Sequence, residues 1–369
     1  MMNFWEDLKT KNQPIIALSP MDGITDYPFR KMVTKYGKPD VIYTEFMCVD
    51  QIFHAKNDLI SEFIYDDTQR PLIAQVFGID PELFYISAQI VCELGFDGID
   101  INMGCPSKNV AGRGAGAGLI KNPELASRII ASTKKGIADW VNDGVAKDFP
   151  ARVYKKLDST KLTLSKLGVK IKSGEKSEYA QRVAIPVSIK TRIGYAENEV
   201  ETWIPFLVKQ DLSCIALHGR TYKQLYHGMA DWQAIGRAKE LIDSEHKSNP
   251  SITKPLLLGN GDIQTLKDAY ELCKKHNTDG VLIGRSFLGK PWLLSAGPVE
   301  ELAEQKLFDI ILEHSKLQEE FDSKNFFRVR KHLAWYCKGF RGASELRQQL
   351  VLSENYENVK KILQNFLTR

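Results

Sequence analysis

The chain of 369 residues is 43% hydrophobic and 26% charged, which is the balance of an ordinary globular protein with a sizeable buried core. Its 50 basic and 46 acidic residues leave a formal charge of +4, which is too small to indicate a nucleic-acid partner without local clustering. Because no stretch approaches the roughly 20 apolar residues that span a bilayer, and the N-terminus lacks the apolar segment of a secretion signal, we expect a soluble, cytoplasmic protein with no membrane partner.

Short apolar runs bounded by Gly, Pro or Asp recur between residues 15 and 285, and we predict each of them as a β-strand. Their largely apolar character favours parallel strands that are covered on both faces. The eight predicted strands are residues 15–20, 41–46, 72–77, 98–103, 187–191, 214–219, 256–260 and 280–284.

Helix signals lie between many of these strands. Phe29, Met32, Val33 and Tyr36 fall on one helical face, and Gly37 is placed to end that helix. Eight strands that alternate with helices predict a (β/α)₈ TIM barrel. An open doubly wound sheet is the alternative, but it would more often carry GxGxxG after its first strand, and that motif is missing there.

Residues 139–182 break the alternation, because more than eighty residues separate the fourth and fifth predicted strands. With ten Lys or Arg and six Asp or Glu, this segment is predicted to be an insertion, partly ordered at best. It is either a solvated surface excursion or an arm that touches RNA. From about residue 300 helical patterning takes over, which predicts a barrel domain over residues 1–298 and a small helical domain over residues 299–369.

The active site of a TIM barrel forms at the C-terminal ends of its strands. The seventh predicted strand ends in Asn260-Gly261-Asp262, and the eighth ends in Gly284-Arg285. Glycine lets backbone N–H groups approach a phosphate closely, and arginine can bind phosphate oxygens through two N–H groups. Barrels often bind a phosphate beside strands 7 and 8, so we predict a phosphate site here rather than two plain turns.

Lys190 lies near the end of the fifth predicted strand, where an uncompensated ammonium would be costly. It is a candidate Schiff-base nucleophile, a cation beside a reduced flavin, or a structural lysine paired with Glu45 or Asp100. His218, at the end of the sixth strand, could donate a hydrogen bond to a cofactor or be a satisfied barrel histidine.

The six cysteines are scattered, with no CxxC pair and no histidines nearby at metal-ligand spacing. We therefore expect reduced thiols, no disulfide framework and no bound metal. Cys105 differs from the others because it lies in a Gly-Cys-Pro turn after the fourth strand, before the glycine-rich residues 110–118. That position puts its thiol on the functional face, whereas we interpret Cys48 and Cys214 as structural.

Seven runs in order along residues 14–295 resemble the tRNA-dihydrouridine synthase family, and residues 327–347 are similar to the C-terminal domain of its bacterial members. The runs are SPMDGITDYPFR (19–30), AQVFG (74–78), DGIDINMGCPSKNVAGRGAGAGL (97–119), SIKTR (188–192), LHGRT (217–221), GNGDI (259–263) and GVLIGR (280–285). Ser19 departs from the alanine that is common before Pro-Met, and the insertion over residues 139–182 is unusual.

The resemblance implies FMN, reduced by NADPH, and the conversion of a tRNA uridine to 5,6-dihydrouridine. It implies that hydride passes from the flavin N5 to C6 of uracil, that Cys105 gives the proton to C5, and that Asn102 faces the target uracil. The residues implied in FMN binding are Pro20, Met21, Asp22, Gln75, Lys190, His218, Asn260, Gly261, Asp262, Gly284 and Arg285.

A tRNA partner fits the C-terminal region, where residues 324–347 contain seven Lys or Arg and a single acidic residue. The aromatic side chains interleaved with these cations are expected to be mostly core. The residues expected to contact the tRNA are Asn102, Arg192, Arg220, Arg330 and Lys331, and the enzyme is expected to be a monomer.

Three other functions remain open from the residues alone. The first is an FMN barrel that reduces a free small molecule such as a dihydropyrimidine, and the second is a lyase that uses Lys190 as a Schiff base. The third is a non-catalytic tRNA-binding or folding role. The long insertion leaves open which tRNA uridine is the target.

Overall fold

The computed structural model describes residues 3–54, 56, 60–171, 182–295 and 304–368. The chain divides into two compact units. The first combines Met1–Met21 with Asp40–Ile283, and the second combines Asp22–Pro39 with Gly284–Arg369. The predicted domain boundary between residues 298 and 299 lies outside the described residues.

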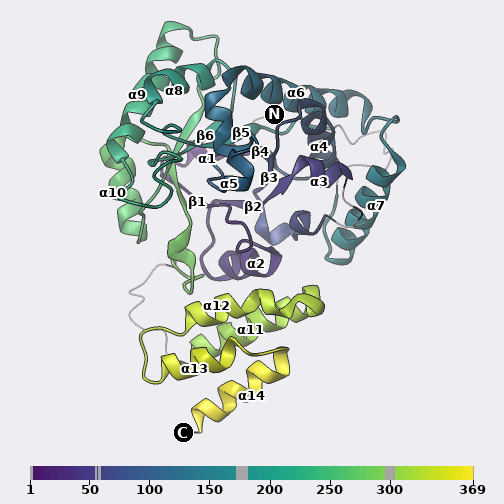
Figure 1. Ribbon diagram of the computed structural model, residues 1–369, viewed down its shortest axis with the longest axis vertical. Helices are drawn as coiled ribbons and strands as arrows, with labels where there is room; N and C mark the ends of the chain where they lie inside the picture. Colours follow the sequence, from purple (N-terminus) through teal and green to yellow (C-terminus); the bar gives the residue numbers. More distant parts are fainter. Residues whose placement is uncertain (1–2, 55, 57–59, 172–181, 296–303, 369) are drawn as a thin grey trace. The chain divides into compact units, whose positions relative to one another are not determined.

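The first unit is built on eight parallel strands that close into a barrel in chain order (Figure 1). The predicted TIM barrel is therefore confirmed, and each predicted strand matches an observed one to within two residues at either end. The strands are β1 (Ile15–Leu18), β2 (Val41–Cys48), β3 (Leu72–Phe77), β4 (Gly98–Met103), β5 (Val187–Arg192), β6 (Cys214–His218), β7 (Leu256–Asn260) and β8 (Gly280–Ile283).

Apart from α1, which precedes β1, the helices of the first unit follow the strands and cover the outside of the barrel. Several begin with a side-chain cap: the Asp80 side chain accepts from the N–H of Glu82, and the Asn122 side chain accepts from the N–H of Leu125. The helices are α1 (Phe4–Thr10), α3 (Val49–His54), α4 (Pro81–Glu93), α5 (Lys108–Ala111), α6 (Pro123–Asp143), α7 (Ala151–Lys166), α8 (Val200–Val208), α9 (Trp232–Ser248) and α10 (Leu266–His276). Short 3₁₀ turns are η1 (Ser61–Phe63), η2 (Asp67–Gln69) and η3 (Gly116–Lys121).

Apolar side chains fill the end of the barrel where the strands begin. Trp5 and Leu8 of α1 are buried in one cluster with Ile15 of β1, Val41 of β2 and Leu256 of β7. A capping box at Asn3 and Glu6 fixes the start of α1. The polar interior of the barrel therefore lies toward the opposite end, where the strands finish.

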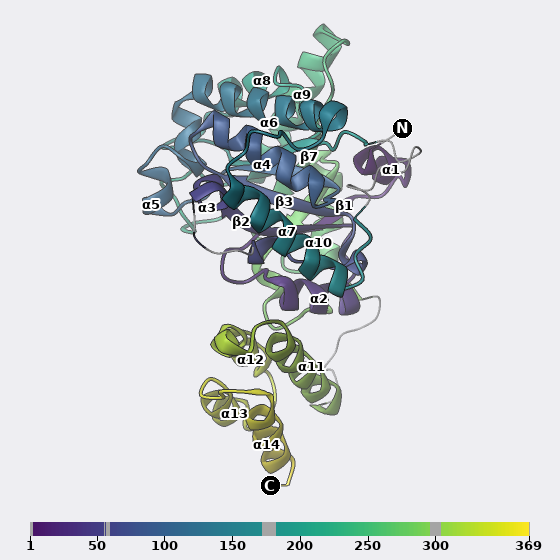
Figure 2. The ribbon, with the colours of Figure 1, turned by 90° about the vertical axis from the view of Figure 1, so that its right-hand side faces the viewer.

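The segment predicted to be an insertion contains a helix. Its first residues complete the last turns of α6, and residues 151–166 form helix α7, which lies beside α3 (Figures 1 and 2). Val153, Leu157 and Leu164 supply a buried apolar face, and Lys156 Nζ donates to the carbonyl oxygens of residues 51 and 52. The prediction of a partly ordered insertion rests on the charges of the segment and does not include this helix. Residues 172–181 lie outside the described part of the chain.

The second unit packs α2 (Tyr27–Tyr36) with four helices of the C-terminal region around one apolar cluster, which includes Met32 from α2. Of the aromatic residues that were expected to be mostly core, Phe326 and Tyr336 are buried, whereas Phe327 is 57% exposed. The remaining helices are α11 (Glu304–Asp322), α12 (Arg330–Tyr336), α13 (Ala343–Leu350) and α14 (Tyr356–Leu367), with 3₁₀ turns η4 (Arg285–Phe287) and η5 (Ser323–Val329). The predicted C-terminal helices are present.

Candidate active site

Strand register stacks polar side chains in layers inside the barrel. Ala216 of β6 and Leu258 of β7 belong to the apolar cluster inside the barrel, so the residues paired with them on neighbouring strands also face the interior. Alternate residues of one strand face the same side, so every second residue along these strands faces the interior as well. There are three polar layers along the strands. The first, deepest in the barrel, pairs Asp100 with Ser188, and the second pairs Asn102 with Lys190. The third, at the mouth of the barrel where the strands end, contains Arg192, His218 and Asn260.

The lowest polar layer is a hydrogen-bonded network around Asp100, which is fully buried. Its carboxylate accepts from Nε2 of Gln75 at 2.6 Å and from the hydroxyl of Ser188 at 2.7 Å. Burial raises the pKa of Asp100 to about 6, although both hydrogen bonds and the nearby Lys190 favour its charged form. Gln75 also accepts from Nδ2 of Asn102 at 2.9 Å, so its amide is held in one orientation.

Asn102 shapes the turn that carries Cys105. Its Oδ1 accepts hydrogen bonds from the backbone N–H groups of Gly104, at 3.0 Å, and of Cys105. The Cys105 side chain is 6% exposed and is covered by the loop that follows, since a Cβ on Gly116 would lie 3.0 Å from the Cβ of Cys105. Gly116 has a φ of +54°, in the left-handed region that glycine adopts without strain.

Lys190 is half-buried between the Asp100 network and the mouth. Among the described residues no carboxylate lies within ion-pair distance of its Nζ, so the paired structural lysine considered from the sequence is not seen there. Burial lowers the pKa of Lys190 to about 8, and Arg192 lowers it further, while Asp100 and Cys105 act in the opposite sense. The Lys190 ammonium, between the Asp100 network and the mouth of the barrel, could therefore pair with a negatively charged ligand.

Arg192, the last residue of β5, is 2% exposed and connects two loops, those after β4 and β6. Its Nε donates to the carbonyl oxygen of Gly104 at 2.7 Å, and its Nη1 donates to those of Thr221 at 3.0 Å and Leu225 at 3.2 Å. Burial lowers its pKa to about 10, but it stays charged at neutral pH. Most of the N–H donors of this guanidinium are therefore used within the protein. These hydrogen bonds hold the Cys105 turn beside the loop after β6.

A second buried cation, Arg220, links the ends of β6 and β7. It forms a two-oxygen ion pair with Asp262 at 2.7 and 2.8 Å, and its Nη1 lies 3.3 Å from Nε2 of His218. Asp262 also accepts from the N–H of Ala230 at 2.7 Å. Its carboxylate therefore serves to position Arg220 and the loop at Ala230.

The residues assigned to a phosphate site are positioned by the ends of β7 and β8. The Asn260 side chain donates to the carbonyl oxygen of Leu282 at 2.8 Å. Gly261 has a φ of +126°, and a Cβ there would lie 2.6 Å from Ala230, so only glycine fits. In the second unit, Gly284 follows β8 directly and the exposed Arg285 begins η4.

The run after β1 supplies three further predicted residues. Pro20 is buried, Met21 is half-buried and Asp22 is exposed. Met21 ends the first stretch of the first unit, and Asp22 begins the second unit.

A stack of side chains on three loops at the strand ends was not predicted from the sequence. The rings of Tyr195 and Tyr222 stack with centroids 4.5 Å apart and planes 20° apart, and Lys121 Nζ lies 4.4 Å from the Tyr195 centroid. Two backbone hydrogen bonds of 3.0 Å, from Tyr222 to Gly194 and from Lys223 to Tyr195, fasten two of these loops together. Tyr195 and Tyr222 follow Arg192 and Thr221 at the ends of two strands, and this position in the sequence could have indicated them as site residues.

Arg330 and Lys331 lie at the start of α12 in the second unit. Arg330 donates from Nε to the carbonyl oxygen of Ser353 at 2.6 Å, which orients its guanidinium. Lys331 Nζ would lie 3.5 Å from a Cβ on Gly23, so it covers the loop before α2. Both side chains are half-buried.

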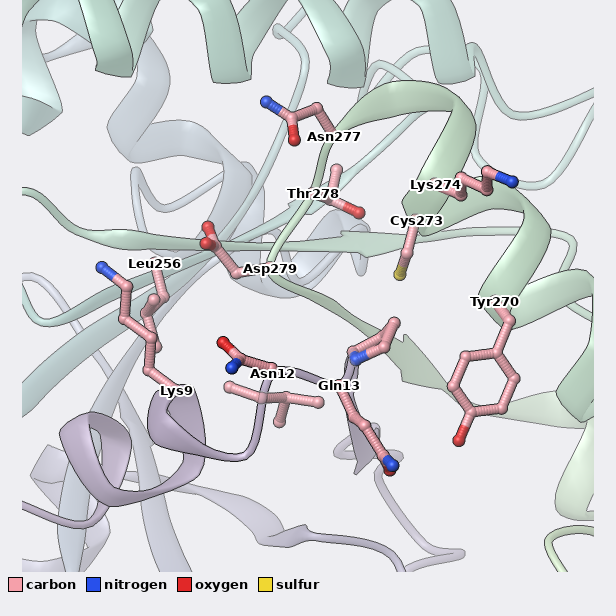
Figure 3. A pocket seen from close by; sticks show the side chains of 12 residues that line it. Lys9, Asn12, Gln13, Leu256, Tyr270, Cys273, Lys274, Asn277, Thr278 and Asp279 are labelled. Carbon is pink, nitrogen blue, oxygen red and sulfur yellow. The ribbon is translucent and has the colours of Figure 1, made fainter.

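A separate pocket of about 530 Å³ opens at the other end of the barrel (Figure 3). Its lining includes Ile15 and Leu256, at the starts of β1 and β7, and Asp279 just before β8. None of the predicted site residues lines it. The polar layers and this pocket are distinct features of the barrel.

None of the described helices is long and apolar enough to span a bilayer. Among solved structures, histamine dehydrogenase from Rhizobium sp. 4-9 is similar with a TM-score of 0.46 at 9% identity, over 82% of this chain and 49% of that one. An old yellow enzyme homologue from Zymomonas mobilis has a TM-score of 0.39 at 12% identity, over 79% and 91%. Likenesses of this size carry no weight for the assignment.

Sequence comparisons are decisive. A "Probable tRNA-dihydrouridine synthase" of Staphylococcus aureus (strain COL) is 30% identical over 370 residues, covering 99% of this chain and 95% of the relative. A "Probable tRNA-dihydrouridine synthase 2" of Bacillus subtilis (strain 168) is 30% identical over 370 residues, covering 99% and 96%. The dihydrouridine synthase (Dus) family model matches residues 16–142 and 177–369. The chain therefore belongs to the dihydrouridine synthase family and is an oxidoreductase.

Proposed function

We propose that this chain reduces the C5–C6 double bond of a uridine in tRNA to give 5,6-dihydrouridine, with FMN as the cofactor and NADPH as the electron donor. Family membership and the names of the relatives support a tRNA substrate. The single observation that carries the chemistry is that Asn102 and Lys190 share one polar layer and that Asn102 holds the backbone of Cys105 beside it. A monomeric, cytoplasmic enzyme is part of the same proposal.

The donor set of the barrel suits the polar edge of a flavin ring. Gln75 donates one N–H of its amide to Asp100. An amide nitrogen carries two, so among the described residues the second N–H remains available to a ligand. Lys190 offers three N–H donors and a positive charge beside it. Gly261, where a side chain cannot fit, allows a ligand to approach the backbone closely. In this proposal Gln75 and Lys190 bind the ring, while Asn260, Gly261 and Asp262 form and support the phosphate end.

The remaining assignments rest on the resemblance and on chain position. Pro20 and Met21 follow β1, and Asp22 comes next in the chain. Gly284 and Arg285 follow β8 in the same way. We include all five, together with His218, among the residues proposed to bind FMN.

Reduction of the uracil ring needs a hydride at C6 and a proton at C5, and the bound cofactor, once reduced, supplies the hydride. Cys105 supplies the proton, because a thiol carries a proton that it can donate as a general acid. Its turn is fixed by Asn102 through two backbone N–H groups. Holding the donor in place before reaction lowers the entropic part of the barrier.

Lys190 provides electrostatic stabilisation at the same place. Its pKa of about 8 leaves it mostly protonated at pH 7. In a site that excludes water, a fixed cation stabilises developing negative charge more strongly than it could in bulk solvent. We assign this role to Lys190 in preference to Schiff-base formation, because a cation and a proton donor together suit reduction of a uracil ring.

A stacked uridine must leave its base stack to reach a barrel interior. Stacking on aromatic side chains and contacts between cations and phosphates are the usual means by which proteins hold unpaired RNA. The stack of Lys121, Tyr195 and Tyr222 offers such a surface on the loops next to the Cys105 turn. In the second unit, Arg330, Lys331 and the other cations of residues 324–347 are proposed to contact tRNA phosphates.

The proposal is tested by incubating the purified protein with NADPH and tRNA from a strain that lacks it. We expect yellow protein, NADPH oxidation and new dihydrouridine at a defined tRNA position. Protein that stays colourless after FMN is added would favour the Lys190 lyase instead. NADPH oxidation stimulated by free uracil derivatives but not by tRNA would favour the small-molecule reductase.

A further inference from the structure

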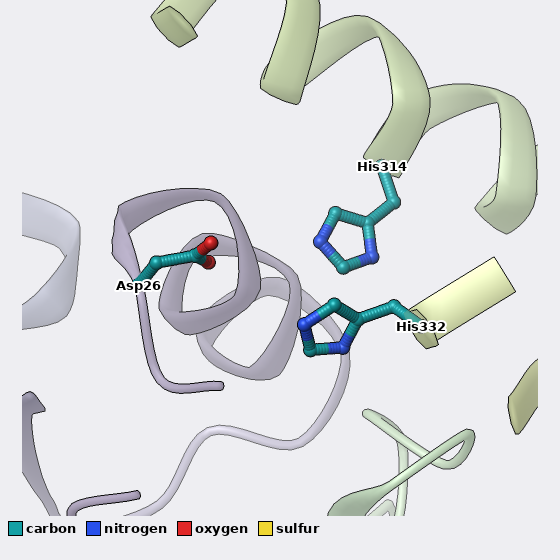
Figure 4. A group of neighbouring side chains, drawn as sticks. All are labelled: Asp26, His314 and His332. Atoms are coloured by element: carbon teal, nitrogen blue, oxygen red, sulfur yellow. The ribbon is translucent and has the colours of Figure 1, made fainter. Parts of the chain in front are cut away.

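Three buried side chains of the second unit converge, and none of them belongs to the polar layers of the barrel. Asp26 is the N-cap of α2, His314 lies on α11 and His332 lies on α12. Their exposed fractions are 6%, 1% and 1%, and one potential ligand atom from each lies within 4.8 Å of the others. Figure 4 shows the carboxylate and both imidazole rings facing the same space between the helices.

His332 is the unusual member of this group. Neither of its ring nitrogens has a hydrogen-bond partner among the described residues. A neutral imidazole carries one N–H donor and one lone pair, and leaving both unused in a buried place is unfavourable. The environment also keeps the ring neutral, because burial lowers the pKa of His332 well below its usual range and that of His314 to about 3. Neutral imidazole is the form that coordinates a metal.

The other two side chains are oriented as metal ligands usually are. Nδ1 of His314 lies 3.0 Å from the hydroxyl of Tyr336. Because this contact occupies Nδ1, Nε2 is the ring nitrogen that would bind an ion. Oδ1 of Asp26 accepts from the backbone N–H of Phe29 at 3.0 Å. The Phe29 ring stacks on His332 with centroids 4.7 Å apart and fixes the plane of that imidazole. Such outer contacts orient the ligands of known metal sites.

We propose that Asp26, His314 and His332 bind one divalent transition-metal ion, Zn²⁺ or Fe²⁺, in the second unit. Two imidazoles and one carboxylate are a ligand set that both ions accept, with water completing the coordination. The deep burial of all three ligands suits a structural ion that ties the start of α2 to α11 and α12. The ion would give His332 the partner that it lacks.

This inference runs against the expectation of no metal, which came from spacing along the chain. Asp26 and His332 are separated by most of the sequence, so no local motif could reveal them. Arg30, Arg328 and Lys331 act on the Asp26 carboxylate and oppose a cation, so binding depends on direct coordination rather than on the local field. The proposal is independent of the reaction, since none of the three residues is assigned to flavin or to the reacting atoms.

The test is the metal content of the full-length protein, purified without chelator and measured by inductively coupled plasma mass spectrometry. We expect about one Zn or Fe per chain in the wild type and less than about a tenth of that in Asp26→Asn and His332→Gln. Asp26→Asn keeps an oxygen for the N–H of Phe29, so it should remain folded. His54→Ala, which removes an exposed histidine of α3, is the matched control and should keep the full metal content.

A second measurement covers variants that fail to fold. Dipicolinate should lower the melting temperature of wild-type protein, and added Zn²⁺ should restore it. Wild-type protein that contains no metal and takes up neither Zn²⁺ nor Fe²⁺ after incubation would overturn the proposal. So would full metal content in Asp26→Asn and His332→Gln, because the ion would then lie elsewhere.

Discussion

The side chain of Asn102 holds the backbone of Cys105. Its Oδ1 accepts from the N–H groups of Gly104 and Cys105, while its Nδ2 donates to Gln75, which in turn donates to the buried Asp100. The turn that carries the thiol is thus joined to the interior of the barrel by a chain of hydrogen bonds. Cys105 owes its position to this chain as much as to its own strand.

Asn102→Ala should therefore impair catalysis more than folding. Losing the two backbone contacts frees the Cys105 turn, and misplacing a reacting group by about 1 Å can cost roughly 100-fold in rate. We expect a fall in kcat of about that size, with bound flavin retained, measured as dihydrouridine formed per minute on tRNA. Asn122→Ala, at the exposed start of α6, is the control. Equal rates for wild type and Asn102→Ala would refute this role of Asn102.

Replacing Lys190 separates two of its candidate roles. Lys190→Met removes the cation and should slow uridine reduction by about 100-fold or more, the size seen when one electrostatic stabiliser is lost. Lys190→Arg keeps a positive charge and should retain part of the activity. A Schiff-base enzyme would lose its activity equally in both variants, so rapid single-turnover measurements on the pair distinguish the two roles.

Asp100 gives the protein a pH-dependent stability. Its pKa is about 6 in the folded chain and 3.8 in the reference state, so the folded chain binds more protons between these values and stability falls as pH rises through them. Asp100→Asn lacks this titration. From pH 4.5 to 7.5 the variant should gain roughly 2 kcal/mol relative to wild type. Urea unfolding at both pH values measures the change, and a constant difference would show that Asp100 does not titrate as stated.

The Tyr195–Tyr222 stack should contribute to tRNA binding but not to the oxidation of NADPH. Stacking of one base on an aromatic ring contributes about 1–3 kcal/mol, so Tyr222→Ala should weaken tRNA binding about 5- to 150-fold. NADPH oxidation without tRNA should be unchanged. Tyr270→Ala, on α10 and 40% exposed, is the control and should bind tRNA as wild type does. Unaltered tRNA affinity in Tyr222→Ala would remove this surface from the account.

The barrel could be predicted from the sequence because its signals are local. Each buried parallel strand is a short apolar run, and caps such as Asp80 mark helix starts within a few residues. The strand-end rule of the fold then located Cys105, Lys190 and Asn260 on the same face. Helix α7 was not predicted because its apolar residues are separated by lysines, although their spacing is helical.

Pairings between distant residues could not be predicted in the same way. The sequence suggested that Arg192 contacts the substrate, and the structure adds that it donates to Gly104, Thr221 and Leu225. Nothing in its own strand indicates those partners, which come from loops after β4 and β6. The same holds for His332, whose unused ring nitrogens are visible only once α2, α11 and α12 are packed.

The central claim is that Cys105 protonates C5 of a tRNA uridine. The most direct test compares wild type with Cys105→Ala, both loaded with flavin and reduced by NADPH, by quantifying dihydrouridine in tRNA from a strain that lacks the enzyme. We predict that Cys105→Ala binds flavin and tRNA but forms dihydrouridine at least about 100-fold more slowly, the usual size of a general-acid contribution. Dihydrouridine formation at the wild-type rate in Cys105→Ala would contradict the account.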